Sequence, residues 1–319
     1  MRFSALLAAI ALTAGGAPAR AQQAAASAAA QVDIAFTPPL ETVLRFRVTR
    51  TKVRSDRPGD IKAAWIEELR FARSGDGFIL YWRMDPTSLP PEMRHPLLAP
   101  MVAPFSGQPI AFDLDADGSP LRVRDWSTVL PKLLQAVDGV LPMAAAQTAD
   151  KAQAERATAQ VRAMFADLDA EQAKSILLKN VAPLLQWGGI SMRVGETVAE
   201  TNEQPVPILG GNVTQNVRVT LAALDPGKTA RIEMRTETDR ASFKQLIAHA
   251  AERFGAIADP AQKEKMTREL AQMERMEIVD SSVVVIDLAT GLPRTLDTSR
   301  KARIEGITQS EDLRIEWLR

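Results

Sequence analysis

The chain has no cysteine and only two histidines, His95 and His249, among its 319 residues. The absence of cysteine excludes disulfide bonds, thiol catalysis, iron–sulfur clusters and zinc sites built on thiolates. It also suits an oxidising compartment, where a free thiol is a liability. Two histidines leave little room for the acid–base and metal chemistry that this side chain usually performs.

An excess of charge of one sign is also missing, because 39 basic side chains are balanced by 39 acidic ones. Nucleic-acid binding needs a clustered basic excess, so this class is excluded. Hydrophobic residues make up 46% and charged residues 24% of the chain, which is typical of a folded globular protein. Beyond the first residues, the longest apolar runs, such as Phe78 to Trp82 and Val283 to Ile286, have the length of a strand.

The start of the chain has the pattern of a secretory signal peptide. Arg2 supplies a positive charge, residues 3–14 are uncharged and largely apolar, and Ala19-Arg20-Ala21 fits the cleavage rule. The apolar segment is shorter than the roughly 20 residues that a membrane-spanning helix needs. We therefore expect a signal peptide over 1–21, cleavage after Ala21 and no transmembrane segment in the mature chain. The expected location is the periplasm, and secretion to the medium is the alternative.

Residues 22–31 are rich in Ala, Gln and Ser and have no charge, so we predict a flexible leader over 22–40. Regular structure then begins with apolar residues that alternate with polar ones, a period of two that predicts strands with one solvated face. Turn residues separate the segments, which indicates an antiparallel meander. The three segments are Leu44–Val48, Trp65–Phe71 and Phe78–Met84.

Seven prolines fall within residues 86–109, a density that excludes a long helix or a central strand. The segment is nonetheless apolar, and an apolar loop must cover something or be covered. One interpretation is a lid over a ligand pocket, and the other is a loop that closes the end of the core. The residues that would form the lid are Leu97, Leu98, Met101, Val102 and Phe105.

The rest of the chain mixes helix and strand patterns. A single apolar stripe at helical spacing occurs in five segments: 129–141, 157–168, 173–184, 243–254 and 266–273. Period-two alternation returns over 190–194, 217–234 and 278–317. This order differs from the regular alternation of a parallel sheet. We predict an α+β fold with a large antiparallel, strongly twisted or half-barrel sheet and helices packed on one face.

No linker divides the mature chain, so we expect residues 41–319 to form a single α+β domain. Division near Gly188 into two halves, each with strands followed by helices, is the alternative. We find no repeated motif that relates the two halves.

The export signal, the opening meander, the strand-turn-strand Pro109–Arg124 and the hairpin at Asp287–Pro293 together resemble uncharacterised exported proteins of proteobacteria. The layout is also similar to the curved half-barrel of LolA- and LppX-type carriers. That resemblance covers most of the mature chain and implies a concave sheet, lined by helices, that holds acyl chains. It lies in layout alone, so it assigns no binding or catalytic residue.

Asp113, Asp115 and Asp117, followed by Gly118, match the first half of a calcium-binding loop. The pattern then fails, because Arg124 stands where a bidentate glutamate is required. We interpret the segment as a polar hairpin. The sequence also lacks a nucleophile elbow, a P-loop, a dinucleotide fingerprint and a zinc-protease motif. We therefore predict no catalytic residue, no metal and no cofactor.

Basic residues are concentrated in the first predicted strand, where Arg45, Arg47, Arg50, Lys52 and Arg54 follow one another closely. On an alternating strand, side chains of this set could share a face and contact anionic lipid headgroups or cell-wall polymer. The alternative is a solvated strand face or an edge protected by charge.

Three functions fit these observations. The favoured one is an exported, non-catalytic envelope protein that binds a lipid or another apolar or amphipathic ligand between sheet and helices. The second is an envelope accessory protein that binds a protein partner and no small ligand. The third, a hydrolase with scattered carboxylates, has the least support.

Overall fold

The computed structural model describes residues 30–56, 59–91, 93–95, 99–145, 159, 162–163, 166, 168–178, 181–206, 211–255, 277–304 and 307–319. The predicted signal peptide at 1–21 lies outside these residues, and so do residues 22–29 of the predicted leader. The helical pattern at 266–273 and most of that at 157–168 also lie outside them.

Eleven strands form one open antiparallel sheet, which confirms the predicted α+β class with a large antiparallel sheet. Period-two sequences become strands because alternate side chains reach the core, as Leu44, Phe46 and Val48 do. Across the sheet the strands are β6 (Pro120–Val123), β5 (Ile110–Leu114), β4 (Gly77–Met84), β3 (Ile61–Ser74), β2 (Val43–Arg54), β13 (Ile307–Leu318), β12 (Leu292–Ile304), β11 (Glu277–Asp287), β10 (Thr229–Thr238), β9 (Gly211–Asp225) and β8 (Thr197–Val206).

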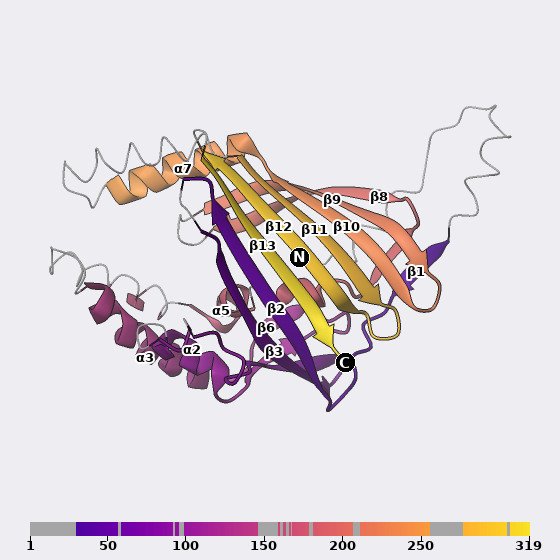
Figure 1. The fold of residues 1–319 in the computed structure, drawn as a ribbon, viewed down its shortest axis with the longest axis horizontal. Coiled ribbons are helices and arrows are strands. Elements are labelled where there is room, and N and C mark those ends of the chain that lie inside the picture. The colour runs from indigo at the N-terminus through magenta and orange to yellow at the C-terminus, as the bar shows by residue number, and fades with distance from the viewer. Residues whose placement is uncertain are drawn as a thin grey trace.

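Strands that are neighbours in the sheet are also consecutive in the chain, except where β2 meets β13. These two strands pair antiparallel from Arg45–Leu318 to Arg54–Gln309. Figure 1 shows the indigo β2 beside the yellow β13 among the long strands that cross the molecule. One hydrogen-bonded sheet therefore contains strands from both halves of the chain.

Five helices belong to the described residues, and side chains of α2, α3, α5 and α6 join the hydrophobic core on one side of the sheet. We call this side, which carries Phe46, Leu80 and Leu221, the inner face. Phe105 of α2 reaches Trp82 of β4, α6 packs into the core, and α7 packs on β9. In Figure 1, α2 and α3 lie together at one end of the molecule. The helices are α2 (Ala99–Ser106), α3 (Trp126–Ala145), α5 (Ala170–Leu177), α6 (Ala182–Leu185) and α7 (Arg240–Gly255).

Helices α5 and α7 begin at aspartates that cap them. Asp169 accepts hydrogen bonds from the backbone N–H groups of Glu171 and Gln172, and the side chain of Gln172 accepts one from Asp169 N–H. Asp239 accepts one from Ser242 N–H at 2.8 Å. Such caps satisfy backbone donors that have no partner within the helix. Helix α7 occupies the segment that the apolar stripe at 243–254 predicts, whereas the single helix predicted from the stripe at 173–184 is divided between α5 and α6.

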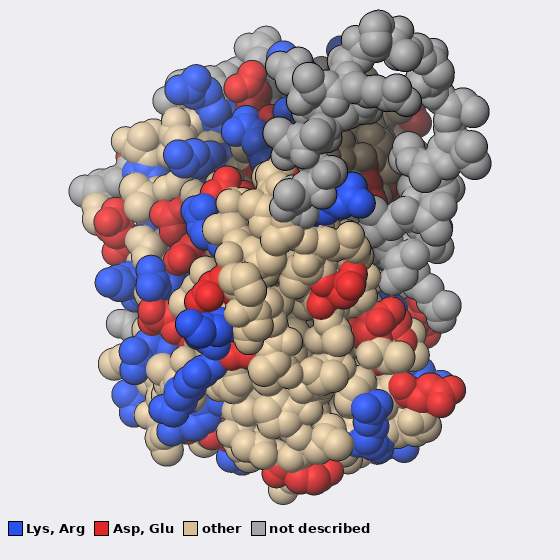
Figure 2. All heavy atoms as spheres, turned by 90° about the vertical axis from the view of Figure 1, so that its right-hand side faces the viewer, with Lys and Arg blue, Asp and Glu red and all other residues tan. Residues whose placement is uncertain are grey.

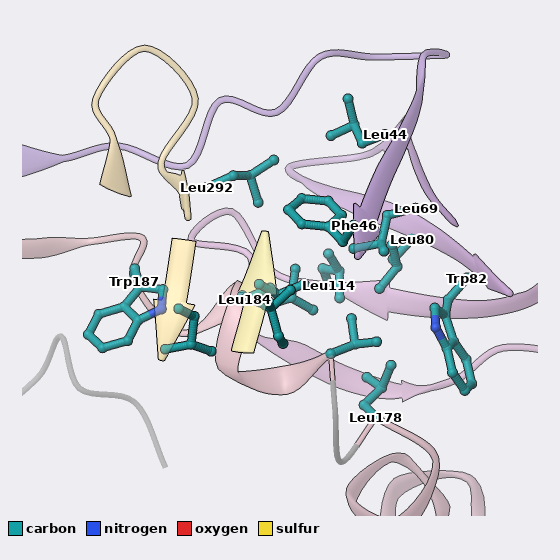
Figure 3. Packing of buried hydrophobic residues seen from close by; sticks show 14 of the residues in the cluster. Leu44, Phe46, Leu69, Leu80, Trp82, Leu114, Leu178, Leu184, Trp187 and Leu292 are labelled. Atoms are coloured by element: carbon teal, nitrogen blue, oxygen red, sulfur yellow. The ribbon is translucent and has the colours of Figure 1, made fainter. Parts of the chain in front are cut away.

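The core lies between the inner face and α6. Leu184 and Leu185 of α6 are fully buried, and Trp187 follows in the turn behind them. Figure 3 shows Leu184 near the centre of the cluster, with Leu114 beside it and Trp187 and Trp82 at its two ends. The short helix thus supplies the apolar side chains that fill this part of the inner face.

Residues 31–40 correct the prediction of a flexible leader. β1 (Gln31–Ile34) pairs with β7 (Ile190–Arg193) in a separate two-stranded sheet. Beyond it, the ring of Phe36 meets the rings of Phe71 and Phe78 edge-on, with centroids 5.6 and 5.2 Å away. The prediction is wrong here because this segment has its own short period-two series of buried residues, Val32, Ile34 and Phe36.

Turns from distant parts of the chain close around Phe36. Gly291 has a φ of 71°, and a Cβ at this position would collide with the carbonyl oxygen of Ala35. A Cβ on Gly188 would collide with the Asp117 carbonyl oxygen and would lie 2.7 Å from Cβ of Phe36. Glycine is required at these two positions because the backbones approach too closely for any side chain.

We expect Phe36→Ala to lower the free energy of unfolding by about 3–5 kcal/mol, because it removes a buried ring and leaves a cavity. Leu40→Ala is the matched control, since Leu40 lies in the same segment and is 43% exposed. Urea unfolding followed by circular dichroism measures both. Equal, small losses in the two variants would contradict the role that we give to Phe36.

Candidate functional site on the inner face

The registers of the strands arrange the inner face in rows that run across the sheet. The row nearest the core, which we call the buried row, contains only apolar residues that are at most 2% exposed. It joins β9 to β3 without interruption. Its members are Leu221, Ile232, Val284, Leu296, Ile315, Val48 and Trp65.

Two residues further along each strand, the same face changes character. This middle row mixes apolar side chains with hydroxyl groups and one cation, and most of its members are only partly buried. Ser282 and Thr298 share a hydrogen bond of 3.0 Å between their hydroxyl groups. The middle row consists of Val219, Met234, Ser282, Thr298, Leu313, Arg50 and Ala63.

Most side chains of the next row are charged, and we call it the charged row. It consists of Val217, Thr236, Asp280, Arg300, Glu311 and Lys52. Arg300 binds both carboxylate oxygens of Asp280, at 2.8 and 2.7 Å. Glu311 pairs with Arg50 of the middle row at 3.1 Å and with Lys52 at 3.3 Å. The hydrogen bond from Arg300 to Asp280 raises the pKa of the guanidinium further, so Arg300 is a permanent cation.

A buried carboxylate lies below the buried row. Glu67 of β3 is fully buried between Phe46 and Met84, its partners in the strand registers. One carboxylate oxygen accepts a hydrogen bond from the indole N–H of Trp65 at 3.0 Å, and the other accepts one from Trp82 at 3.3 Å. Burial raises the pKa of Glu67 to about 7, although the two indoles and the nearby charge of Arg50 act in the opposite direction.

These groups form a chain of contacts along the inner face. The guanidinium of Arg50 lies 5.8 Å from the centroid of the Trp65 ring, and Trp65 donates to Glu67. Trp82, the second donor, contacts the ring of Phe105 in α2 at 5.7 Å. The charged row, the buried carboxylate and the proline-rich segment are therefore connected through packed side chains.

The predicted lid is only partly described. Leu97 and Leu98 lie outside the described residues, and Met101 falls within α2 without a described side chain. Val102 and Phe105 pack against the hydrophobic core of the inner face. The arrangement places a short helix over Trp82, and its role as a lid stays a prediction.

An apolar pocket of about 50 Å³ opens beside the middle row at the β8–β10 end of the sheet. Met234 and Val219 of the middle row form part of its wall, and Val198 of β8 lies beside Val219. The opposite wall comes from the segment after α6, namely Trp187, Ile190 and Met192. The pocket thus continues the apolar part of the inner face.

The acidic hairpin is used for local structure. Asp113 binds Arg122 at 2.8 Å and Arg124 at 3.2 Å, and Asp115 accepts hydrogen bonds from the backbone of its own turn. The hairpin lines an open cleft of about 1450 Å³ together with α5.

In the part of the chain that the structure describes, no group of three acidic or histidine residues could hold a metal ion. The two histidines, His95 and His249, are exposed.

The basic residues of β2 divide between two faces. Arg45 and Arg47 point away from the core, whereas Arg50 and Lys52 lie on the inner face.

Figure 2 shows the side of the molecule at the right of Figure 1, where uncharged residues form a central band flanked by charged ones. Among the described helices, each is too short or too polar to cross a membrane.

Comparisons with known proteins give little guidance. No protein-family model and no curated protein matches the chain. One solved structure, titled "Lipid-protein interactions in lipovitellin", is similar at 7% identity and a TM-score of 0.41. The similarity covers 88% of this chain and 25% of that one, so this chain spans about a quarter of the other protein's length.

Sequence reasoning missed Glu67, although the signal is present. In β3 the alternation Trp65, Glu67, Leu69, Phe71 places an acidic residue on the apolar side. A charged residue at an inward position is rarely buried without a partner, so it marks a site to inspect. The second indole belongs to β4 and is found only through the register between the strands.

We expect Glu67→Gln to remove a pH dependence of stability. The folded pKa of about 7 exceeds the ordinary value of 4.5, so the stabilising effect of protonation is complete below pH 4.5 and is lost as pH rises through 7. The wild type should lose roughly 3 kcal/mol over this range from this group. Urea unfolding at pH 5 and pH 8 measures the difference, and an equal pH dependence in the glutamine variant would contradict the assignment.

Proposed function

We propose that the protein is an exported, non-catalytic binding protein that holds an apolar or amphipathic ligand on its inner face. The observation that carries this proposal is the change between rows. A fully buried apolar row gives way to a middle row that is partly accessible, without a change of strand or face. Partly accessible apolar side chains beside a few polar groups are the usual lining of a ligand site.

The inner face favours an amphipathic ligand that lies along the sheet over one that is enclosed in a cavity. The pocket beside Met234 is small, at about 50 Å³, and cannot enclose a whole lipid chain. The middle row extends from it toward Arg50, so an extended chain has a continuous surface to follow. The ligand would lie along the sheet, on the side that carries the buried row.

We also propose that the sheet is strongly twisted and curves as a half-barrel around α6. A strongly twisted sheet, curved as a half-barrel around α6, gives the inner face the concavity that a bound chain needs. The contacts of α2, α6 and α7 with one side of the sheet support it. A signal peptide over 1–21 and a periplasmic location complete the proposal, on the strength of the sequence pattern at the start of the chain.

A second candidate is the envelope accessory protein that binds a protein partner. Within the described residues, β8 pairs with β9 on one side and its other edge is open. An open strand of ten residues offers backbone groups to a further strand. A protein that co-purifies, together with the absence of any extractable ligand, would favour this function.

Native mass spectrometry of the mature protein, purified from periplasm without detergent, tests the first proposal. A bound mass of lipid size at one copy per protein supports it, and organic extraction then identifies the compound. A clean mass of the protein alone, together with no binding of added lipids, would contradict it.

Two adjacent residues of β8 provide matched variants. Val198 lines the pocket on the inner face, whereas its neighbour Ala199 is exposed on the other side. We expect Val198→Trp to fill the pocket and to reduce ligand occupancy in the mass spectrum several-fold. Ala199→Trp adds the same side chain outside the pocket and should leave occupancy unchanged. Equal occupancy in both variants would remove this pocket from the site.

A further inference from the structure

We infer that the ligand of the inner face is an anionic amphiphile. Its headgroup would contact Arg50 and Lys52, and its chain would lie along the middle row toward the pocket at Trp187. This inference rests on the proposed function and adds the charge of the ligand and its direction on the sheet.

The charge balance of the two outer rows is the first argument. Arg50, Lys52 and Arg300 supply three cations, whereas Glu311 and Asp280 supply two carboxylates. Glu311 is shared, because one of its oxygens faces Arg50 and the other faces Lys52. The two outer rows therefore carry one more cation than carboxylate, and this excess of positive charge favours an anionic headgroup.

Accessibility is the second argument. The side chains of Lys52 and Arg300 are 40% and 53% exposed, although they stand on the same face as the fully buried row. A headgroup can therefore reach them without opening the core. Arg50 is more enclosed, at 27% exposed, and lies against Trp65. A carboxylate or phosphate that meets Arg50 would be partly shielded from water, which strengthens the attraction.

The surface between the two ends is the third argument. Arg50 on β2 and Met234 on β10 are separated by β13, β12 and β11, which is roughly 19 Å at the usual strand spacing. Leu313, Thr298 and Ser282 occupy the intervening positions. Because Thr298 and Ser282 bond each other, an apolar chain can cover them at little cost in lost hydrogen bonds.

The opposite orientation of the ligand, with its headgroup at the pocket near Trp187, fits the charges of the inner face less well. At the pocket end, the one charged residue in the lining is an acid, Glu200. An anionic headgroup placed there would meet repulsion from Glu200 and would leave its chain against Lys52 and Arg300. The distribution of charge therefore determines which end of the sheet holds the headgroup of the ligand.

The test compares four amphiphiles with the same hexadecyl chain: hexadecanoate, hexadecyl phosphate, uncharged hexadecanol and cationic hexadecyltrimethylammonium. Each is titrated into delipidated full-length protein below its micelle concentration, and binding is followed by calorimetry and native mass spectrometry. We expect the two anions to bind about tenfold or more tightly than hexadecanol. The advantage should shrink at high salt because exposed charges are screened. The carboxylate and phosphate probes distinguish the two kinds of headgroup.

Variants locate the headgroup. Arg50→Gln with Lys52→Gln should abolish most of the preference for anions, whereas Arg47→Gln, on the outer face of the same strand, should not change it. Glu311→Gln removes a competing carboxylate and should tighten anion binding several-fold. If the double variant fails to fold, the effect of Glu311→Gln on anion affinity still shows whether the headgroup binds beside Arg50 and Lys52.

The outcomes separate the two proposals. Binding of the anions with the expected response to the variants supports the inference. Equal binding of all four probes, or a preference for the cation, overturns the inference and leaves the proposed function intact. Binding of none of them contradicts the proposed function itself.

Discussion

The pairing of β2 with β13 is the constraint on which the inner face depends. It joins the strands of the first part of the chain to those of the last part in one sheet. It also places Arg50 and Lys52 of β2 beside Glu311 of β13, and it extends the buried row from Ile315 to Val48. Without this pairing neither the continuous rows nor the cation cluster would exist.

The inner face contains a buried apolar row and, further along the same strands, rows that carry charge. The buried row and the side chains of α6 supply the apolar burial that stabilises the fold. The rows beyond it hold charges that are only partly solvated, and Glu67 holds a carboxylate that burial makes unfavourable to ionise. A buried carboxylate such as Glu67 lowers stability when it ionises, and such groups are common at sites that bind or react. That contrast is why the proposed site lies here.

Much of the secondary structure could be predicted from local pattern. The alternation at Leu44–Val48 and the capping aspartates Asp169 and Asp239 act over a few residues, so the sequence displays them directly. The site could not be predicted in the same way. The grouping of Arg50 with Glu311 depends on a pairing between distant strands, and short-range periodicity carries no information about it. Composition also concealed the order of the segment that contains Phe36, since Ala, Gln and Ser dominate the residues before it.

The same long-range pairing has a consequence for the kinetics of folding. Thr308 N–H bonds the hydroxyl of Ser55 across 253 residues of chain, at one end of the β2–β13 pair. Closing a loop of that length costs chain entropy before the contact contributes any favourable free energy. Sheets dominated by such contacts therefore fold slowly. Phe36 can be enclosed only after the turn that contains Gly291 has formed. Early in folding, the apolar side chains that Phe36 covers, Phe71 and Phe78, would therefore remain exposed to water, and this is the stage at which the chain is most prone to aggregate.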